Sequence, residues 1–358
     1  MNRYFDFNAT TPLLPEAREA WLRASERHWQ NPSSLYRDAG IASQMLEAAR
    51  ERLAGLLGVE AERIVFTSGA TEANNMLFAA FAGKQTAIST IEHPSVREAA
   101  RHWTRVSEFD AHGAMPDDAA LISVMAANNE SGELLPWREL AARCREMGMP
   151  FHTDATQWIG KLATDFSGCD YITGSAHKFG GPKGAGFLVL RDEDERMRMI
   201  HGGPQENGRR AGTENYPAIE AMVTALETIT SKVNACDASG RDAFEKAMQA
   251  SFEGLRIISA DVPRLWNTSL MVMPRHDNLK WLTRLSRRGF SISTGSACSS
   301  GKEGSSVVVT ALGASPEELR RVVRLSGGWG TTKEDWLELA AFFAEVGAEL
   351  DAGGKGGQ

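Results

Sequence analysis

The sequence predicts an α/β protein, with a parallel sheet covered by helices on both faces and a smaller α+β region after it. Short β-rich runs between residues 63 and 190 alternate with segments of helical periodicity, which is typical of parallel βαβ units. After a long helical stretch near 215–235 this alternation ends, and a smaller α+β pattern follows. We therefore expect a large domain over residues 15–235, a small domain from residues 1–14 and 236–350, and a disordered tail at 351–358.

The expected elements follow in order along the chain. Two helical blocks lie within residues 15–57, where apolar residues recur at helical spacing. The expected strands of the large domain are RIVFT, TAIST, LISVMAA, PFHTDA, DYITGS and AGFLVL, and a long helix follows near 215–235. In the small domain we expect helices at 240–252, 277–288 and 332–347 and strands at 265–273 and 321–325.

Composition excludes several classes of protein. The 358 residues are 42% hydrophobic and carry a net charge of −7 without a basic tract, so we expect neither nucleic acid nor an anionic membrane as a partner. No apolar run approaches the roughly 20 residues of a membrane helix, and the first residues lack an apolar signal region. We expect a cytoplasmic protein. Four scattered cysteines, without metal-ligand spacing, are expected to be reduced thiols and to bind no metal: Cys144, Cys169, Cys236 and Cys298.

Polar residues follow the strands of the predicted sheet, where ligands bind in α/β proteins. SGATE at 68–72 is a glycine turn that leads into a helix and suits a phosphate, although such a turn can also be a plain cap. Asp154 follows another strand and could likewise cap a helix, and His93 and Lys178 follow two more. Together, a phosphate turn, a carboxylate, a lysine and an imidazole are the set that pyridoxal 5′-phosphate (PLP) requires.

Cys298 lies in the stretch SISTGSACSS, which is almost entirely small and polar. A free cysteine is most often an inert core residue. Glycines at 295 and 301 bracket this one, and the stretch has no apolar face to pack, so we expect an exposed thiol on a mobile loop. Exposure alone does not activate a thiol, because its pKa lies near 8.5.

The motifs resemble those of the NifS-type cysteine desulfurases, members of the class V aminotransferase family. The resemblance runs in order from residue 4 to about residue 332. It rests on SGATEANN (68–75), EHPSV (92–96), NNESG (128–132), HTDATQWIGK (152–161), GSAHKFGGPKGAG (174–186), GGPQENGRRAGTEN (202–215) and STGSACSSG (293–301). It implies the fold type I architecture of PLP-dependent transferases, a large α/β/α domain with a mostly parallel mixed sheet and a smaller α+β domain.

The resemblance also implies roles for individual residues. Lys178 would bind PLP covalently, Asp154 would pair with its pyridine nitrogen, and His93 would stack on the ring and carry protons. Gln157 would bind the ring hydroxyl, and the substrate carboxylate would be held by Asn129 and Arg324, whose planar fork suits a carboxylate. The residues expected to grip the phosphate are Ala70, Thr71, Ser175 and His177, with Thr213 reaching it from the partner subunit of a homodimer.

The implied reaction converts L-cysteine to L-alanine. Lys178 would take the α-proton, and the Cys298 thiolate would attack the substrate sulfur and leave with it as a persulfide for an acceptor protein, in iron–sulfur assembly or a thiolation pathway. Two alternatives remain: a selenocysteine lyase or other PLP-dependent lyase or aminotransferase, and an idle sulfur-carrier or scaffold subunit.

Three features depart from the family pattern. The segment after the cysteine motif reads KEGSSVV, Trp329 stands where many members have arginine, and the region beyond the last predicted helix is short. All three bear on the acceptor, and from them we expect docking unlike that of members that serve a general iron–sulfur scaffold.

Overall fold

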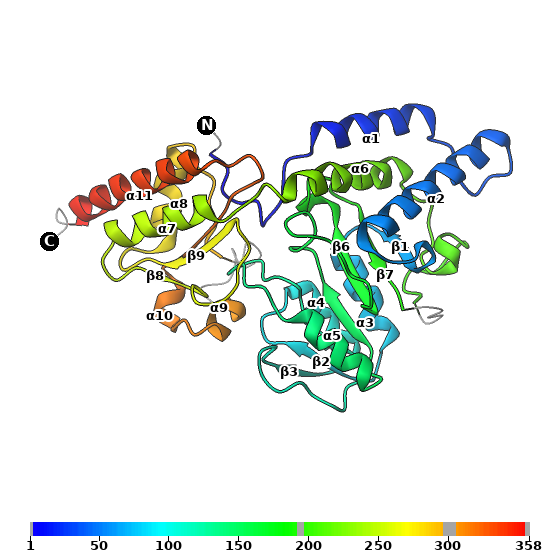
Figure 1. Ribbon diagram of the computed structural model, residues 1–358, viewed down its shortest axis with the longest axis horizontal. Helices are drawn as coiled ribbons and strands as arrows, with labels where there is room; N and C mark the ends of the chain where they lie inside the picture. The colour runs from blue at the N-terminus through cyan, green and yellow to red at the C-terminus, as the bar shows by residue number, and fades with distance from the viewer. Residues whose placement is uncertain (1–2, 192–196, 296–305, 355–358) are drawn as a thin grey trace. The chain divides into compact units, whose positions relative to one another are not determined.

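The computed structural model describes residues 3–191, 197–295 and 306–354, and these form two compact units (Figure 1). The smaller unit comprises Met1–Thr10, Asn128–Leu134 and Ala235–Gln358, and the larger one Thr11–Ala127 and Leu135–Asn234. Residues 128–134, expected in the large domain, thus belong to the smaller unit. Among the helices of the described segments, none combines the length and the apolar character needed to cross a membrane.

The larger unit is built on a seven-stranded sheet in the order β1-β7-β6-β5-β4-β2-β3. Its strands are β1 (Ile64–Thr67), β2 (Gln85–Ser89), β3 (Arg105–Phe109), β4 (Ile122–Ser123), β5 (Phe151–Asp154), β6 (Tyr171–Ser175) and β7 (Gly186–Val189). The sheet is parallel except for β7, which runs antiparallel to both β1 and β6. Only ten residues join β6 to β7, too few for the helical crossover that a parallel strand needs. The mostly parallel mixed sheet is confirmed.

Two strands of this sheet differ from the expected ones. β3 was not predicted, because RVSEF mixes polar and apolar residues, as an edge strand can. The run expected as a strand over 121–127 has only two ladder residues in β4. Beyond them, the backbone N–H groups of Val124 and Ala126 still donate to His152 and Asp154 at 3.0 and 2.9 Å, so the segment keeps its place beside β5.

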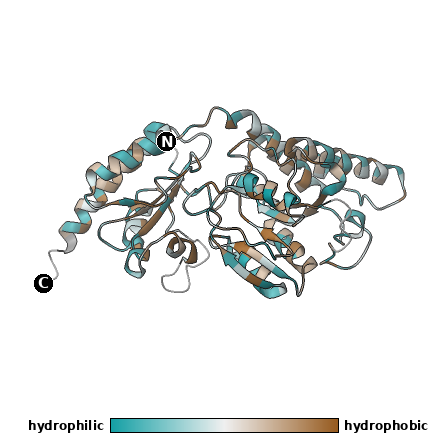
Figure 2. Cartoon of the chain, turned by 60° about the horizontal axis from the view of Figure 1, so that its bottom comes forward, coloured by the Kyte–Doolittle hydropathy of each residue, from teal (hydrophilic) through white to brown (hydrophobic). Residues whose placement is uncertain are grey.

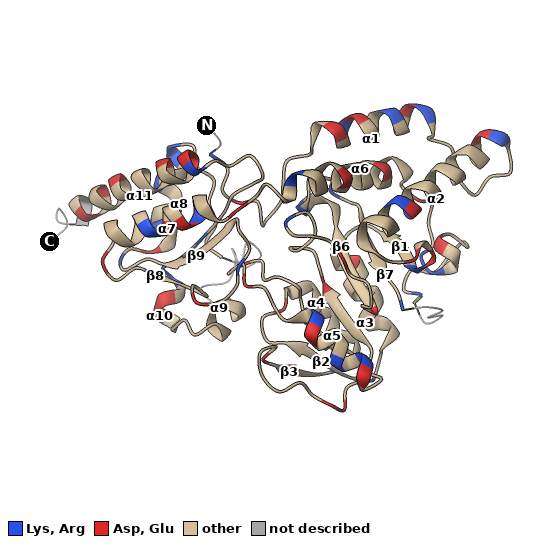
Figure 3. Ribbon diagram, in the orientation of Figure 1, with Lys and Arg blue, Asp and Glu red and all other residues tan. Residues whose placement is uncertain are grey.

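The helices of the larger unit accompany this sheet. They are α1 (Pro15–Arg27), α2 (Arg37–Leu57), α3 (Ala70–Ala80), α4 (Pro94–Trp103), α5 (Trp137–Glu146) and α6 (Tyr216–Val233). α3 packs on β1, β6 and β7 and also on α4, where Met76, Phe78 and Val96 join a buried cluster with Tyr171 of β6. α1 lies along α6 (Figure 1) and carries both acidic and basic residues (Figure 3).

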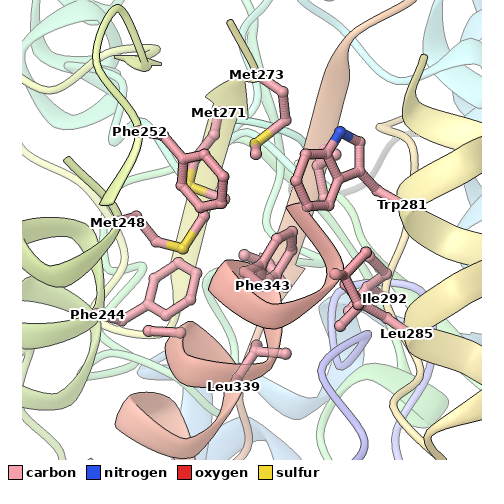
Figure 4. Close-up of a cluster of buried hydrophobic side chains, with 14 of the residues drawn as sticks. Phe244, Met248, Phe252, Met271, Met273, Trp281, Leu285, Ile292, Leu339 and Phe343 are labelled. Atoms are coloured by element: carbon pink, nitrogen blue, oxygen red, sulfur yellow. The ribbon is translucent and has the colours of Figure 1, made fainter. Parts of the chain in front are cut away.

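The smaller unit packs helices on a three-stranded antiparallel sheet, β10-β9-β8. Its elements are α7 (Ser239–Ser251), β8 (Arg256–Ile257), β9 (Thr268–Val272), α8 (Asn278–Arg287), α9 (Val307–Ala311), α10 (Pro316–Leu319), β10 (Val322–Ser326) and α11 (Lys333–Gly354). Its core joins Phe244 of α7, Met271 of β9, Trp281 of α8 and Phe343 of α11 (Figure 4). In Figure 2, α11 shows alternating hydrophobic and hydrophilic stretches, as one buried face requires.

Both ends of the chain belong to this unit. The N–H of Phe5 donates to Ser291, and the Phe5 carbonyl accepts from Ser326 at 2.9 Å, so the N-terminal segment extends the sheet of the smaller unit. The expectation of a disordered tail from residue 351 is wrong for its first four residues, which complete α11. Asp351 binds both His276 and Arg275, and these contacts explain why the helix continues; residues 355–358 lie outside the described part.

Candidate active site

The turn between β1 and α3 forms a glycine cradle in the larger unit. Gly69 has a φ of +149° and stands immediately before the helix, in a backbone conformation that side chains disfavour. A Cβ on Gly186, at the start of β7, would lie 2.5 Å from the Gly69 Cα, so only glycine permits this close approach. Ala70 and Thr71 follow as the first residues of α3, whose leading N–H groups have no partner within the helix. Such an N-terminus favours an anion.

Ser175, His177 and Lys178 follow β6 directly. Ser175 ends the strand beside the Gly69 turn, and the other two lie in a short 3₁₀ turn, Ala176–Lys178. Burial, together with the positive charges of Lys178, Lys183 and Lys161, lowers the pKa of His177 to about 4. His177 is therefore neutral near pH 7 in a region of positive potential, which suits a phosphate.

Asp154 ends β5 and is buried. Its Oδ1 accepts from the N–H of Thr156 at 3.0 Å, and its Oδ2 accepts from Asn74 Nδ2 at 3.1 Å. Gln157 follows on the next turn, also buried, and its side-chain oxygen accepts from Lys161 Nζ at 2.6 Å. These bonds hold both side chains in one orientation.

His93 stands before the first residue of α4 and caps it. Its Nδ1 accepts from the N–H of Ser95 at 3.1 Å and lies 2.8 Å from the Ser95 hydroxyl oxygen. Burial lowers the pKa of His93; the charge of Asp154 opposes this shift, and that of Lys178 adds to it. The cap therefore holds a neutral imidazole.

Thr213 lies exposed on the loop of residues 202–215, which two ion pairs attach to the same unit. Arg210 binds Glu72 in the first turn of α3, at 2.8 Å. Arg50 of α2 binds Glu206 with two hydrogen bonds of 2.8 and 2.9 Å, and both side chains are buried. The loop is thus attached to the helix that begins at the glycine cradle.

Asn129 and Arg324 lie together in the smaller unit. Arg324, on β10, is 2% exposed, donates to the Asn129 carbonyl at 3.1 Å and pairs with Asp6 at 2.6 Å. Within the described residues its Nε has no hydrogen-bond partner, and neither does the side-chain oxygen of Asn129. A buried donor without a partner is costly, so this arginine suits an added acceptor such as a carboxylate.

Cys298 lies outside the described residues, as does most of the STGSACSSG motif. The described residues on either side lie near Glu130 of the NNESG motif. Ser306 Oγ donates to its carboxylate at 2.8 Å, and a Cβ added to Gly295 would lie 3.2 Å from the same oxygen. Glu130 itself is buried.

The other three cysteines have raised thiol pKa values. Burial raises the pKa of Cys144 to about 11 and raises those of Cys169 and Cys236 as well, with nearby aspartates adding to the effect. A raised pKa removes the thiolate that would be the nucleophile. These three thiols suit the inert role expected for them.

Trp329, which stands at the arginine position of many family members, packs within the smaller unit. Its ring meets the Phe7 ring edge-on at 6.1 Å, and it lines a small cavity of about 130 Å³ with Trp266 and Trp336. The position therefore contributes an apolar surface instead of a guanidinium.

The family model for class V aminotransferases matches residues 3–339. A cysteine desulfurase of Rhodobacter capsulatus is 36% identical, over 97% of this chain and 97% of its own length. The chain belongs to the class V aminotransferases and, among them, to the cysteine desulfurases. The cysteine desulfurase IscS of Dictyoglomus turgidum is 35% identical over 93% of this chain and 91% of its own.

Solved structures of the family agree with this assignment. A NifS-like protein has a TM-score of 0.87 at 28% identity, over 97% of this chain and 100% of that one. The structure of SspA in complex with cysteine has a TM-score of 0.79 at 31% identity, over 91% of this chain and 98% of that one. The predicted family and fold are therefore confirmed.

Class V aminotransferases are PLP-dependent enzymes, and the residues of this desulfurase fit that cofactor. The turn at Gly69 would be blocked by any side chain on Gly186, and it opens onto a helix N-terminus, where a phosphate is stabilised. The donor set is also suitable, since a buried carboxylate, a lysine and a neutral imidazole follow neighbouring segments.

Two residues that contact the predicted site in this desulfurase were not identified from the sequence. Asn74 contacts Asp154, and Ser95 contacts His93. Both lie inside quoted motifs, SGATEANN and EHPSV, but an asparagine within a helix and a serine after a proline have ordinary explanations. The helical spacing of Ala70 and Asn74, one turn apart on α3, is the signal that could have identified Asn74.

Proposed function

We propose that this protein is a PLP-dependent cysteine desulfurase, which converts L-cysteine to L-alanine and retains the sulfur as a persulfide on Cys298. The observation that carries the proposal is the placement of Asp154, His93 and Lys178 around one end of the larger sheet, beside the glycine cradle. Cysteine desulfurases similar over nearly the whole chain support it.

PLP, when bound, withdraws electrons from the substrate and weakens the bonds around its α- and β-carbons. Asp154 would hold the protonated pyridine nitrogen, and Gln157 would donate to the ring hydroxyl, since its own oxygen already accepts from Lys161. The Lys178 amine would bind the cofactor covalently and then take the substrate's α-proton. Its half-buried position limits the water that would compete for that proton.

The phosphate would be gripped by Ala70, Thr71, Ser175 and His177, and Thr213 would reach it from the partner subunit of a homodimer. The exposure of Thr213 supports this, because a side chain that serves another subunit lies on the surface of its own. Asn129 and Arg324 would bind the substrate carboxylate, with Arg324 supplying the Nε donor that has no partner among the described residues.

Cys298 would attack the sulfur of the bound substrate as a thiolate. The bond between the substrate's β-carbon and sulfur breaks, a sulfur–sulfur bond forms on Cys298, and the carbon fragment takes up protons to become alanine. The raised pKa values of Cys144, Cys169 and Cys236 support the choice of Cys298. A protein acceptor would then remove the sulfur. Both the acceptor and the cytoplasmic location stay predictions.

The test compares two substitutions with the unchanged protein after treatment with L-cysteine. Wild type should form alanine and carry one persulfide, located by mass spectrometry on Cys298. Cys298→Ser should keep the absorbance of bound PLP but form no persulfide. Lys178→Ala should form neither alanine nor persulfide, because proton removal fails first.

Other outcomes distinguish the alternatives. Cys144→Ser is the matched control and should behave as wild type. A persulfide on Cys144, Cys169 or Cys236 would contradict the choice of nucleophile. Undiminished turnover of selenocysteine by Cys298→Ser, with none of cysteine by wild type, would indicate a selenocysteine lyase. A protein that takes up no PLP would be a scaffold or carrier.

A further inference from the structure

A line of hydrogen bonds joins Asp154 to His93 within the larger unit. Asn74 Nδ2, on α3, donates to Asp154 Oδ2 at 3.1 Å and to Ser95 Oγ at 3.0 Å. Ser95 Oγ lies 2.8 Å from His93 Nδ1, on α4. Asn74 is fully buried and Ser95 is half-buried, so little water competes for these bonds. The line exists because α3 and α4 pack against each other.

The hydrogens along this line can be counted. The Asp154 oxygen accepts, so the Asn74 group that faces it is the NH₂, and its two hydrogens supply Asp154 and Ser95. The Ser95 hydroxyl then accepts from Asn74, and its single hydrogen remains for His93 Nδ1. The Ser95 backbone N–H also points at this nitrogen, at 3.1 Å.

Two donors at Nδ1 decide which ring nitrogen of His93 carries the proton. A hydrogen on Nδ1 would face the Ser95 N–H, which cannot turn away because it belongs to the first turn of α4. Nδ1 must therefore be the unprotonated nitrogen, and the proton of the neutral ring lies on Nε2.

We propose that Asn74 and Ser95 are positioning residues that hold His93 in its Nε2–H tautomer and connect this tautomer to Asp154. The tautomer follows from the hydrogen-bond count alone, whereas its meaning for catalysis rests on the proposed function. The neutral ring then begins each turnover with Nε2–H as a hydrogen-bond donor, and the task of taking the α-proton is left to Lys178.

The experiment uses ¹⁵N-histidine-labelled protein as purified, with His93 assigned by comparison with His93→Gln. Wild type should give an unprotonated-type signal at Nδ1 and a protonated-type signal at Nε2 of His93. Ser95→Ala leaves the backbone N–H of residue 95 as the single donor to Nδ1, so the ring is held by one hydrogen bond instead of two, can turn away from the cap and should populate the other tautomer measurably. Asn74→Ala should have the same effect, because the freed Ser95 hydroxyl can then turn away from Nδ1. Ser95→Thr keeps the hydroxyl and should restore the wild-type pattern.

His152 is the internal control. It is also buried, its Nδ1 lies 2.8 Å from Ser123 Oγ, and it contacts neither Asn74 nor Ser95 among the hydrogen bonds of the described residues. Its signals should stay unchanged in each variant, which separates a local effect from a general loss of structure.

Kinetics give a second readout. Ser95→Ala should lower kcat about tenfold, roughly the worth of the one hydrogen bond that Nε2–H supplies, with KM nearly unchanged. A wild-type His93 that carries its proton on Nδ1, or a tautomer that is the same in Ser95→Ala and Asn74→Ala as in wild type, would overturn the proposal. Neither result depends on whether the protein desulfurates cysteine, so a failure of this proposal can be distinguished from a failure of the proposed function.

Discussion

Around Asp154, burial keeps neighbouring titratable side chains neutral. Burial lowers the pKa of His152 to about 4 and also lowers that of His93. Burial likewise raises the pKa of Glu92 to about 8, with the charge of Asp154 adding to this. Near pH 7 these three groups therefore bring little charge of their own to the place where a cationic pyridine ring is proposed to bind. Of these three groups, Glu92 should have a measurable effect on how the free energy of unfolding depends on pH.

We predict that Glu92→Gln becomes more stable relative to wild type as the pH rises. Wild type must keep a proton on Glu92 between its unfolded pKa, near 4.5, and its folded pKa of about 8, so its stability falls with pH by up to about 1.4 kcal/mol per unit in this window. Glutamine keeps the acceptor for Ser89 and for the N–H of Met125. Urea unfolding at pH 5 and pH 8 measures the difference.

The control for this prediction is Glu98→Gln, at an exposed position on α4, which should leave the pH dependence of wild type unchanged. If the stability gap between Glu92→Gln and wild type is constant from pH 5 to pH 8, then Glu92 ionises at its ordinary pKa and the argument from burial is wrong.

Among the connecting segments, the loop of residues 202–215 has a strained backbone, and a buried ion pair holds it in that conformation. Glu206 and Asn207 have φ values of +49° and +55°, which side chains adopt at some cost. The Glu206 carboxylate also accepts from the N–H of Phe66 at 2.8 Å. Burial alone would lower the pKa of Arg50, but its hydrogen bonds to Glu206 and Glu47 raise it above its ordinary value. The ion pair therefore holds a conformation that the loop would not adopt alone.

We predict that Glu206→Gln destabilises the protein by about 3 kcal/mol, because it leaves Arg50 buried with only the exposed Glu47 as a countercharge. The loop that carries Thr213 should then loosen, and PLP should dissociate more readily. Urea unfolding and PLP retention on dilution measure the two effects.

Asn207→Gly is the matched control, since glycine suits a positive φ and leaves the ion pair intact. It should change stability by less than about 1 kcal/mol and should retain PLP. Equal behaviour of the two variants would show that the ion pair does not position the loop.

For the whole molecule, the proposed cofactor and substrate residues divide between the two units. All residues proposed to bind PLP lie in the larger unit, from Ala70 to Thr213, whereas Asn129 and Arg324 lie in the smaller one. A ligand stabilises the structure that it binds, so the two ligands should stabilise different parts of the chain.

We predict that PLP slows hydrogen exchange in the larger unit, chiefly in α3 and the loop of residues 202–215, and leaves β9 and β10 nearly unchanged. Adding L-cysteine to Cys298→Ser, which is expected to bind it without sulfur transfer, should then slow exchange in β10. Exchange followed by mass spectrometry measures both steps. Protection of β10 by PLP alone, or none on adding cysteine, would contradict the proposed division.

Local pattern was sufficient for most of the helices and strands, though not for β3 or β8, because period and turn residues act over a few positions. It was also sufficient to predict that Asp154, His93 and Lys178 lie near one another, because parallel strands end at one edge of a sheet. Only tertiary structure placed residues 128–134 in the smaller unit and set β7 antiparallel to its neighbouring strands. It also brought Asn74 and Ser95 between Asp154 and His93. These features depend on contacts between segments far apart in the chain, such as α3 with α4, and no local period encodes which helices will pack together.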